Sequence, residues 1–170
     1  EEWIGIYQDQ KDYAVCFGVE PEIWQKAEDN QYVPETSLTE TEIRMPGGHL
    51  TIAQLIALLN TIPMEITFVD VDNINRFFNE GPKDFKRPGM AIGREVFSCH
   101  PPKIEATVRR IIGEFRAGAL DEVPIWMDKN GKCMLVRYMA VRDKEGKYLG
   151  TLELVQDMGF AKEHFQPEKR

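Results

Sequence analysis

The sequence predicts an α+β fold in which a single five-stranded antiparallel sheet carries its helices on one face. Three observations lead to this prediction. The strand-like segments are split two and three around a helical stretch, and tight turns join neighbouring strands. Tight turns join antiparallel strands, because a parallel pair needs a long crossover. One strongly amphipathic segment lies between the two groups of strands. A helix of this kind has to bury its apolar stripe against another element, and the sheet can provide that surface.

The first elements of the domain are a helix and a hairpin. Thr51 and Gln54 form a capping box, which predicts a helix that starts near Ile52 and ends at Pro63. Residues 66–69 and 74–78 are strand-like and flank a turn-prone Asp-Val-Asp-Asn segment, so they predict an antiparallel hairpin.

A long helix is predicted after Pro102. Apolar residues recur there at spacings of four, three, one and three, which keeps one stripe of a helix facing a core; they are Ile104, Val108, Ile111, Ile112 and Phe115. Pro102 suits the first turn of a helix, and Gly118 suits its end.

Three strands follow, over residues 123–128, 132–142 and 148–156. Asn130-Gly131 supplies a two-residue hairpin turn, and Glu145-Gly146 marks the second turn.

We expect three regions along the chain. Residues 1–48 form an N-terminal extension and connector whose aromatic residues pack on the domain or on a partner, residues 49–160 form the compact domain, and residues 161–170 form a tail. The chain begins at Glu1 without an initiator methionine, so we also expect it to be part of a longer polypeptide.

The composition limits the classes of partner that we expect. The formal net charge of −7 argues against nucleic acid and anionic membranes, because both attract clustered Lys and Arg. Three widely separated cysteines are not a disulfide framework and fit a reducing compartment. No segment approaches the length of a membrane span. We therefore predict a cytoplasmic protein.

Several short motifs in this order resemble a PAS domain, the five-stranded sensory module of bacterial signalling proteins. They are Ile66-Thr67-Phe68-Val69-Asp70, Ile92-Gly93-Arg94, His100-Pro101, Arg142-Asp143-Lys144-Glu145-Gly146 with Gly150, and Asp157. More narrowly, residues 60–70 and 99–103 resemble the PAS-like domain at the C-terminal end of bacterial proteins that also carry a hemerythrin-like HHE cation-binding domain and a domain of unknown function. This resemblance implies that the iron-binding helices of such a protein lie outside this sequence.

The candidate ligand residues are Cys99 and His100, which stand directly before the long helix. The resemblance implies a ligand between that helix and the sheet, and His100 is then the candidate to bind haem iron or a polar ligand, with Cys99 beside it. The competing interpretation is that His100 caps the helix and Cys99 packs as a small apolar residue. As sequence neighbours the two are poorly placed to act as nucleophile and base, so we expect no enzymatic activity.

The predicted cavity wall is aromatic and consists of Phe68, Phe78, Phe115 and Tyr138. The leading hypothesis is therefore a non-enzymatic sensory or regulatory domain that binds a small ligand, with haem as one candidate. The alternative is a protein–protein interaction or dimerisation module whose core is filled by its own side chains. The expected partners are a small ligand, a second copy of the chain, or other domains of the full-length protein.

Overall fold

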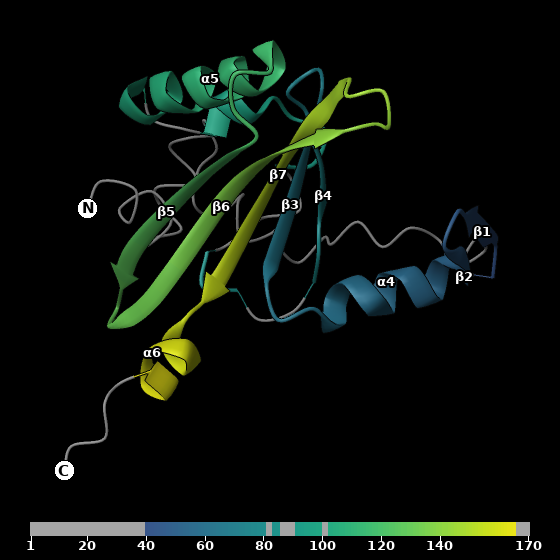
Figure 1. Cartoon of the computed structure of the whole chain (residues 1–170), viewed down its shortest axis with the longest axis horizontal. Coiled ribbons are helices and arrows are strands. Elements are labelled where there is room, and N and C mark those ends of the chain that lie inside the picture. Colours follow the sequence, from purple (N-terminus) through teal and green to yellow (C-terminus); the bar gives the residue numbers. More distant parts are fainter. Residues whose placement is uncertain (1–39, 81–82, 86–90, 100–101, 166–170) are drawn as a thin grey trace, which may run out of the picture.

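The computed structural model describes residues 40–80, 83–85, 91–99 and 102–165, of which residues 99, 102 and 103 are described in backbone only. Its centre is a five-stranded sheet with the strand order β4-β3-β7-β6-β5, in which every neighbouring pair is antiparallel (Figure 1). The strands are β3 (Glu65–Asp70), β4 (Asn75–Phe78), β5 (Glu122–Lys129), β6 (Lys132–Arg142) and β7 (Tyr148–Asp157). The predicted α+β fold with a five-stranded antiparallel sheet is confirmed.

The helix α5 (Pro102–Ala117) lies across one face of the sheet, preceded by the short 3-10 helix η3 (Val96–Cys99) (Figure 1). All five residues of its predicted apolar stripe are buried, and Phe115 is completely enclosed. Ile111 and Phe115 pack with Met134, Val136 and Val155 of the sheet. We call the face of the sheet that contacts α5 the inner face. Burial of this stripe is the main reason that the helix is held on the sheet.

The turns that join β5, β6 and β7 have the predicted residues. Asn130 and Gly131 both have positive φ angles, of 54° and 81°, as the tight turn between β5 and β6 requires. The backbone N–H of Gly131 also donates to Oδ1 of Asp128 at 3.0 Å. Gly146 has a φ of 82° in the turn before β7.

The N-terminal part of the described chain differs from the expected connector. It forms the hairpin β1 (Glu42–Met45) and β2 (Gly48–Thr51), followed by α4 (Ile52–Thr61). The capping box is present, since the N–H of Gln54 donates to Thr51 Oγ1 at 3.2 Å and the N–H of Thr51 donates to Gln54 Oε1 at 2.9 Å. Figure 1 shows this unit beside the sheet rather than on it. The N-terminal extension up to residue 39 lies outside the described residues.

A short helix, α6 (Gly159–Phe165), follows β7, where the sequence predicted a tail from residue 161. Its start is fixed to the sheet because the N–H of Met158 donates to the carbonyl of Cys133 at 2.7 Å.

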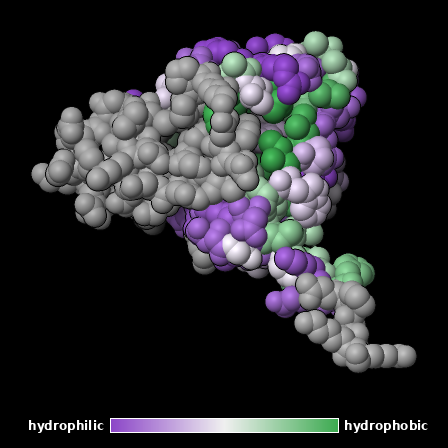
Figure 2. Space-filling view, turned by 90° about the vertical axis from the view of Figure 1, so that its left-hand side faces the viewer, coloured by the Kyte–Doolittle hydropathy of each residue, from purple (hydrophilic) through white to green (hydrophobic). Residues whose placement is uncertain are grey.

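Apolar residues form a band along the side of the molecule that Figure 2 faces, which is the edge of the sheet at β5. Trp126 of β5 is 61% exposed.

Candidate functional site

Four residues form a row across the inner face of the sheet. Phe78 lies opposite Thr67, Thr67 lies opposite Glu153, and Glu153 lies opposite Tyr138. Directly opposed residues of antiparallel strands point to the same face of a sheet. Tyr138 belongs to the buried cluster that includes Phe115, so this row faces α5. We call it the Glu153 row.

Burial differs sharply along the Glu153 row. Thr67 is 4% exposed and Tyr138 is 9% exposed, and Thr151 and Val155 on the same face of β7 are also buried. Glu153 lies between these residues and is only half-buried, as is Phe78 at the end of the row. The Tyr138 hydroxyl donates a long hydrogen bond of 3.5 Å to Glu153 Oε1. A polar group at such a position is suited to orient a small molecule in an otherwise apolar site.

A second polar cluster lies at the end of the inner face, where β3, β5 and β6 meet residues 83–85. Glu65 Oε1 accepts the N–H of Asp84 at 2.6 Å and the N–H of Phe85 at 3.1 Å. The Lys129 ammonium donates to the carbonyl of Asp84 and lies 3.5 Å from the centroid of the Phe85 ring. Buried charges are stable when hydrogen-bonded in this way, so the cluster anchors residues 83–85 to the sheet.

Lys132 joins the same cluster from the turn end of β6. Its Nζ lies 2.7 Å from Asp84 Oδ1, and this hydrogen bond and charge raise the pKa of the Lys132 ammonium. This ion pair holds Asp84 to β6, and both of its side chains are partly exposed to solvent.

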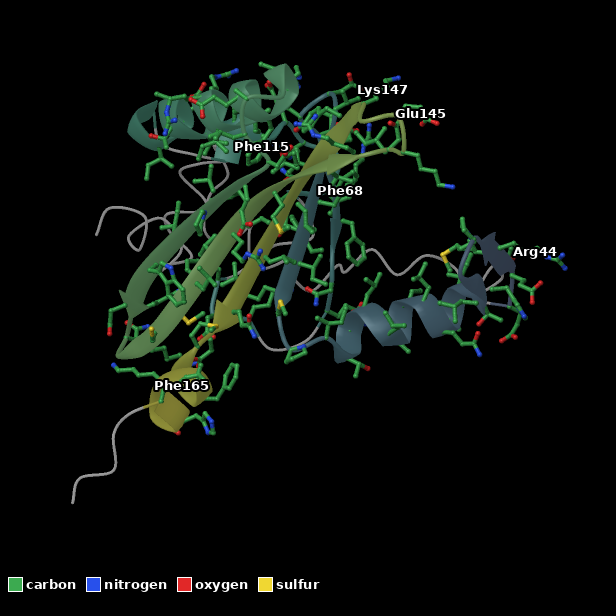
Figure 3. All side chains as sticks on the ribbon, in the orientation of Figure 1. Arg44, Phe68, Phe115, Glu145, Lys147 and Phe165 are labelled. Carbon is green, nitrogen blue, oxygen red and sulfur yellow. The ribbon has the colours of Figure 1, made fainter. Side chains whose placement is uncertain are left out.

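The predicted wall residues are divided between the two faces of the sheet. Phe115 and Tyr138 belong to one buried cluster, and the strand register puts Phe78 on their side. Phe68 was assigned wrongly to this wall: it lies opposite Phe77 and Leu152, on the other face. Its ring atoms lie 2.8 and 2.9 Å from the point where a Cβ on Gly150 would sit. Figure 3 labels Phe115 below α5 and Phe68 on β3.

The Cys-His pair is not tested by the geometry. His100 lies outside the described residues, and Cys99 is described in backbone only, as the last residue of η3. In the part of the chain that the structure describes, no group of three or more His, Cys, Asp or Glu side chains is placed to hold a metal ion. The role of His100 as a ligand to haem iron stays a prediction.

The sequence analysis missed Thr67 and Glu153. The signal was available in β7, where Thr151, Glu153 and Val155 alternate with the apolar residues Leu152 and Leu154. This alternation put one carboxylate on the same face as a buried valine, but only the pairing with β6 identifies that face as the inner one.

None of the described helices has both the length and the apolar character needed to cross a membrane.

Comparison with known proteins identifies a family. A sequence model described as a PAS domain matches residues 55–159. The crystal structure of a C-terminal domain from Streptococcus mutans is 37% identical, with a TM-score of 0.71, and the match covers 74% of this chain and 98% of that chain. A sensory box sensor histidine kinase from Vibrio cholerae is 13% identical, with a TM-score of 0.43 and coverage of 61% and 88%. No curated protein matches the sequence.

The partner prediction is corrected by a third comparison. VqmA of Vibrio cholerae, solved as a complex with ligand and DNA, is 21% identical with a TM-score of 0.47; the match covers 65% of this chain and 52% of VqmA. A protein that contains a region of similar fold therefore occurs in a complex with DNA. Our prediction from the composition, which excluded nucleic acid as a partner, was wrong. The physical reason is that the net charge of one domain does not constrain what binds elsewhere in a polypeptide.

Proposed function

Because the chain belongs to the PAS domain family, we propose that it is a non-enzymatic sensory or regulatory domain that binds a small ligand between α5 and the inner face of the sheet. The observation that carries this proposal is the run of three polar residues across the inner face, Thr67, Glu153 and Tyr138, in which Glu153 is only half-buried.

The Glu153 row is more polar than a core requires. Residues buried only for stability are mostly apolar, because a carboxylate or hydroxyl loses hydration when it leaves water. Three neighbours across the central strands are nevertheless polar, namely Thr67, Glu153 and Tyr138. A few polar groups among apolar walls are typical of a binding site for a small molecule.

The described residues support haem less well than they support another small ligand. An axial ligand to haem iron is commonly a His, Cys, Met or Tyr side chain. The described histidines, His49 and His164, lie on β2 and α6, and Cys133 alternates with buried Met134 and so lies on the other face of β6. Among histidines and cysteines, the haem proposal therefore depends on His100 and Cys99.

The second candidate function is a protein–protein interaction module without a ligand. It is favoured by the complete enclosure of Phe115, Met134 and Val155, which shows that the chain's own side chains fill part of the space below α5. The two functions differ in what occupies the space beside Glu153.

We also propose that the domain is the cytoplasmic, C-terminal part of a larger bacterial protein with a hemerythrin-like domain. Its support is the resemblance of residues 60–70 and 99–103, together with the identity to a C-terminal domain from Streptococcus mutans.

Native mass spectrometry of the purified chain, combined with a thermal-shift screen of small metabolites, tests ligand binding. We expect a retained or stabilising ligand whose effect is lost in Glu153→Gln and kept in Glu145→Gln, since Glu145 is an exposed carboxylate in the turn before β7. An absorption spectrum of haem-supplemented protein tests haem directly, with His100→Ala as the comparison. If no compound is retained and none stabilises the wild-type chain, the interaction module is the better account.

A further inference from the structure

We propose that α4 is the contact between two copies of this chain, with its apolar face packed against the same face of a second copy. This contact is separate from the Glu153 row, and a ligand at that row neither requires it nor excludes it. The inference follows from the exposure of α4, from the lack of charged residues around it and from the polar contacts that fix its direction.

The helix α4 is apolar, but the rest of the described chain does not bury it. Its sequence is Ile-Ala-Gln-Leu-Ile-Ala-Leu-Leu-Asn-Thr, and none of these ten residues is buried. Ile56 is 42% exposed and Leu58 is 49% exposed, on either side of half-buried Leu55 and Leu59. Residues three or four apart are neighbours on a helix, so the large apolar residues form one surface. We call Ile52, Leu55, Ile56, Leu58 and Leu59 the α4 face. An exposed apolar surface of this kind is typical of a protein contact.

The lack of charged residues favours a second copy as the partner. The chain has no Asp, Glu, Lys or Arg between Arg44 and Glu65, although such residues make up 29% of the sequence. A two-fold contact uses the same patch on both copies, so the patch must be complementary to itself. Two uncharged apolar faces meet without like-charge repulsion and without removing a charge from water. A helix that lies on a membrane surface has a strongly charged opposite side, which α4 lacks.

Polar groups lie at both ends of the α4 face. On the β1–β2 hairpin, Glu42 pairs with Arg44 at 3.4 Å and with His49 at 2.6 Å. At the other end, the Asn60 amide donates to Glu80 Oε2 at 3.2 Å, and the N–H of Glu80 donates to Asn60 Oδ1 at 2.9 Å. An apolar centre with a polar rim is the usual arrangement of a protein–protein interface.

Asn79 fixes the direction in which α4 leaves the sheet. This buried side chain donates from Nδ2 to the carbonyls of Leu59 at 3.2 Å and Met64 at 2.8 Å, and its Oδ1 accepts the N–H of Ile66 at 2.8 Å. The C-terminal end of α4 is thereby joined to β3, while Figure 1 shows the helix extending away from the sheet. A face held in a fixed direction loses less conformational entropy on association.

Sedimentation equilibrium of the full chain measures this contact, and we expect a reversible dimer. Ile56→Lys combined with Leu58→Lys puts like charges on both faces and should weaken dimerisation at least about tenfold. Both positions are exposed and Lys is a good helix former, so the fold should persist, which thermal unfolding checks. Trp126→Lys is the control. It changes another exposed apolar residue, on β5, and should leave dimerisation unchanged.

Charge complementation decides whether two α4 faces meet. Ile56→Glu combined with Leu58→Glu should also weaken the dimer, and mixing this double variant with the Lys double variant should restore it as a heterodimer. A wild-type chain that is monomeric at millimolar concentration, a dimer that neither double variant weakens, or a mixture that stays monomeric would overturn the proposal. Binding of a monomeric wild-type chain to phosphatidylcholine vesicles would assign the α4 face to a lipid surface instead.

The two proposals fail separately. A monomeric chain that retains a ligand would remove only the α4 contact. A dimer that meets these expectations but retains no compound would remove only the ligand.

Discussion

The guanidinium of Arg142 donates from Nη2 to the backbone carbonyl of Phe115 at 2.7 Å, so β6 holds the last turn of α5 against the sheet. Carbonyls in the last turn of a helix lack intrahelical donors, and a cationic donor is favourable there. From the other side, Arg116 donates to the carbonyl of Val71 at 2.8 Å and thereby joins the same turn to the β3–β4 connection. The C-terminal end of α5 is thus fixed to two parts of the sheet.

Loss of the Arg142 contact should destabilise the domain. Arg142→Ala removes one of the two donors to the Phe115 carbonyl, the other being the N–H of Gly118, and also the ion pair with Asp121 at 2.9 Å. We expect a loss of about 1–3 kcal/mol in the free energy of unfolding. Urea denaturation measures it. The control is Arg110→Ala, which removes only the exposed pair with Glu114 and should cost about 0.5 kcal/mol or less. Equal effects of the two substitutions would contradict a special role for Arg142.

Phe115 should be among the most sensitive core positions. Its side chain is 0% exposed, so Phe115→Ala leaves a cavity below α5 and should cost about 3–5 kcal/mol. Phe165 on α6 is 80% exposed, and Phe165→Ala is the matched control with an expected change within about 0.5 kcal/mol. Both residues are labelled in Figure 3. A loss below 1 kcal/mol for Phe115→Ala, roughly a third of the expected minimum, would mean that α5 is not packed as described.

Gly150 should not tolerate a side chain. A Cβ there would lie 2.3 Å from the carbonyl oxygen of Val69 and 2.8 Å from the Phe68 ring. Gly150→Ala is therefore expected to destabilise the domain by about 1–3 kcal/mol through overpacking. Gly47→Ala is the control, because nothing lies within 4 Å of its Cβ position. Thermal unfolding of the two variants checks the difference, and an unchanged midpoint for Gly150→Ala would refute the close approach of β3 and β7 at this point.

Acid should weaken the β3–β4 connection through Asp70. Burial alone would raise the pKa of this carboxyl, but hydrogen bonds from the Ile74 N–H, the Arg76 guanidinium and the Asp72 N–H together hold its pKa below the ordinary value of 3.8. A lowered folded-state pKa stabilises the fold at pH values above the unfolded pKa, and this contribution is lost as the pH falls through the folded pKa.

The measurement for Asp70 is the free energy of unfolding between about pH 7 and pH 3. Wild-type protein should lose more stability over the acid part of this range than Asp70→Asn, which lacks the titrating group. Identical pH profiles for the two proteins would show that Asp70 contributes nothing to acid sensitivity.

The sequence predicted the elements with strong local signals. The Thr51–Gln54 capping box, the apolar stripe of α5 and the Asn130-Gly131 turn each act over a few residues, so no knowledge of the fold is needed to interpret them. The β1–β2 hairpin was missed because its two strands have only four residues each and their Gly47-Gly48 turn resembles a connector.

The site was harder to predict because its residues lie on different strands. The register of strand pairing decides which of them are neighbours and which face of the sheet they occupy. Phe68 was chosen by its residue type, whereas the pairing of Thr67 with Phe78 fixes Phe68 on the other face. Glu153 was missed because a charged residue in a strand normally faces solvent. Only its pairing with Tyr138, a member of the buried cluster, places it below α5. A shift of one residue in register would reverse both assignments.

The most direct test of ligand binding at the Glu153 row is an NMR titration of methyl-labelled protein with a compound that stabilises the chain in the thermal-shift screen. Val136 and Val155 report on the inner face, and Leu152 and Leu154 report on the opposite face of the same strands. Saturable shifts confined to the valine methyls, and abolished in Glu153→Gln, are the predicted result. Shifts confined to the leucine methyls, or no saturable shift at either face, would contradict the account.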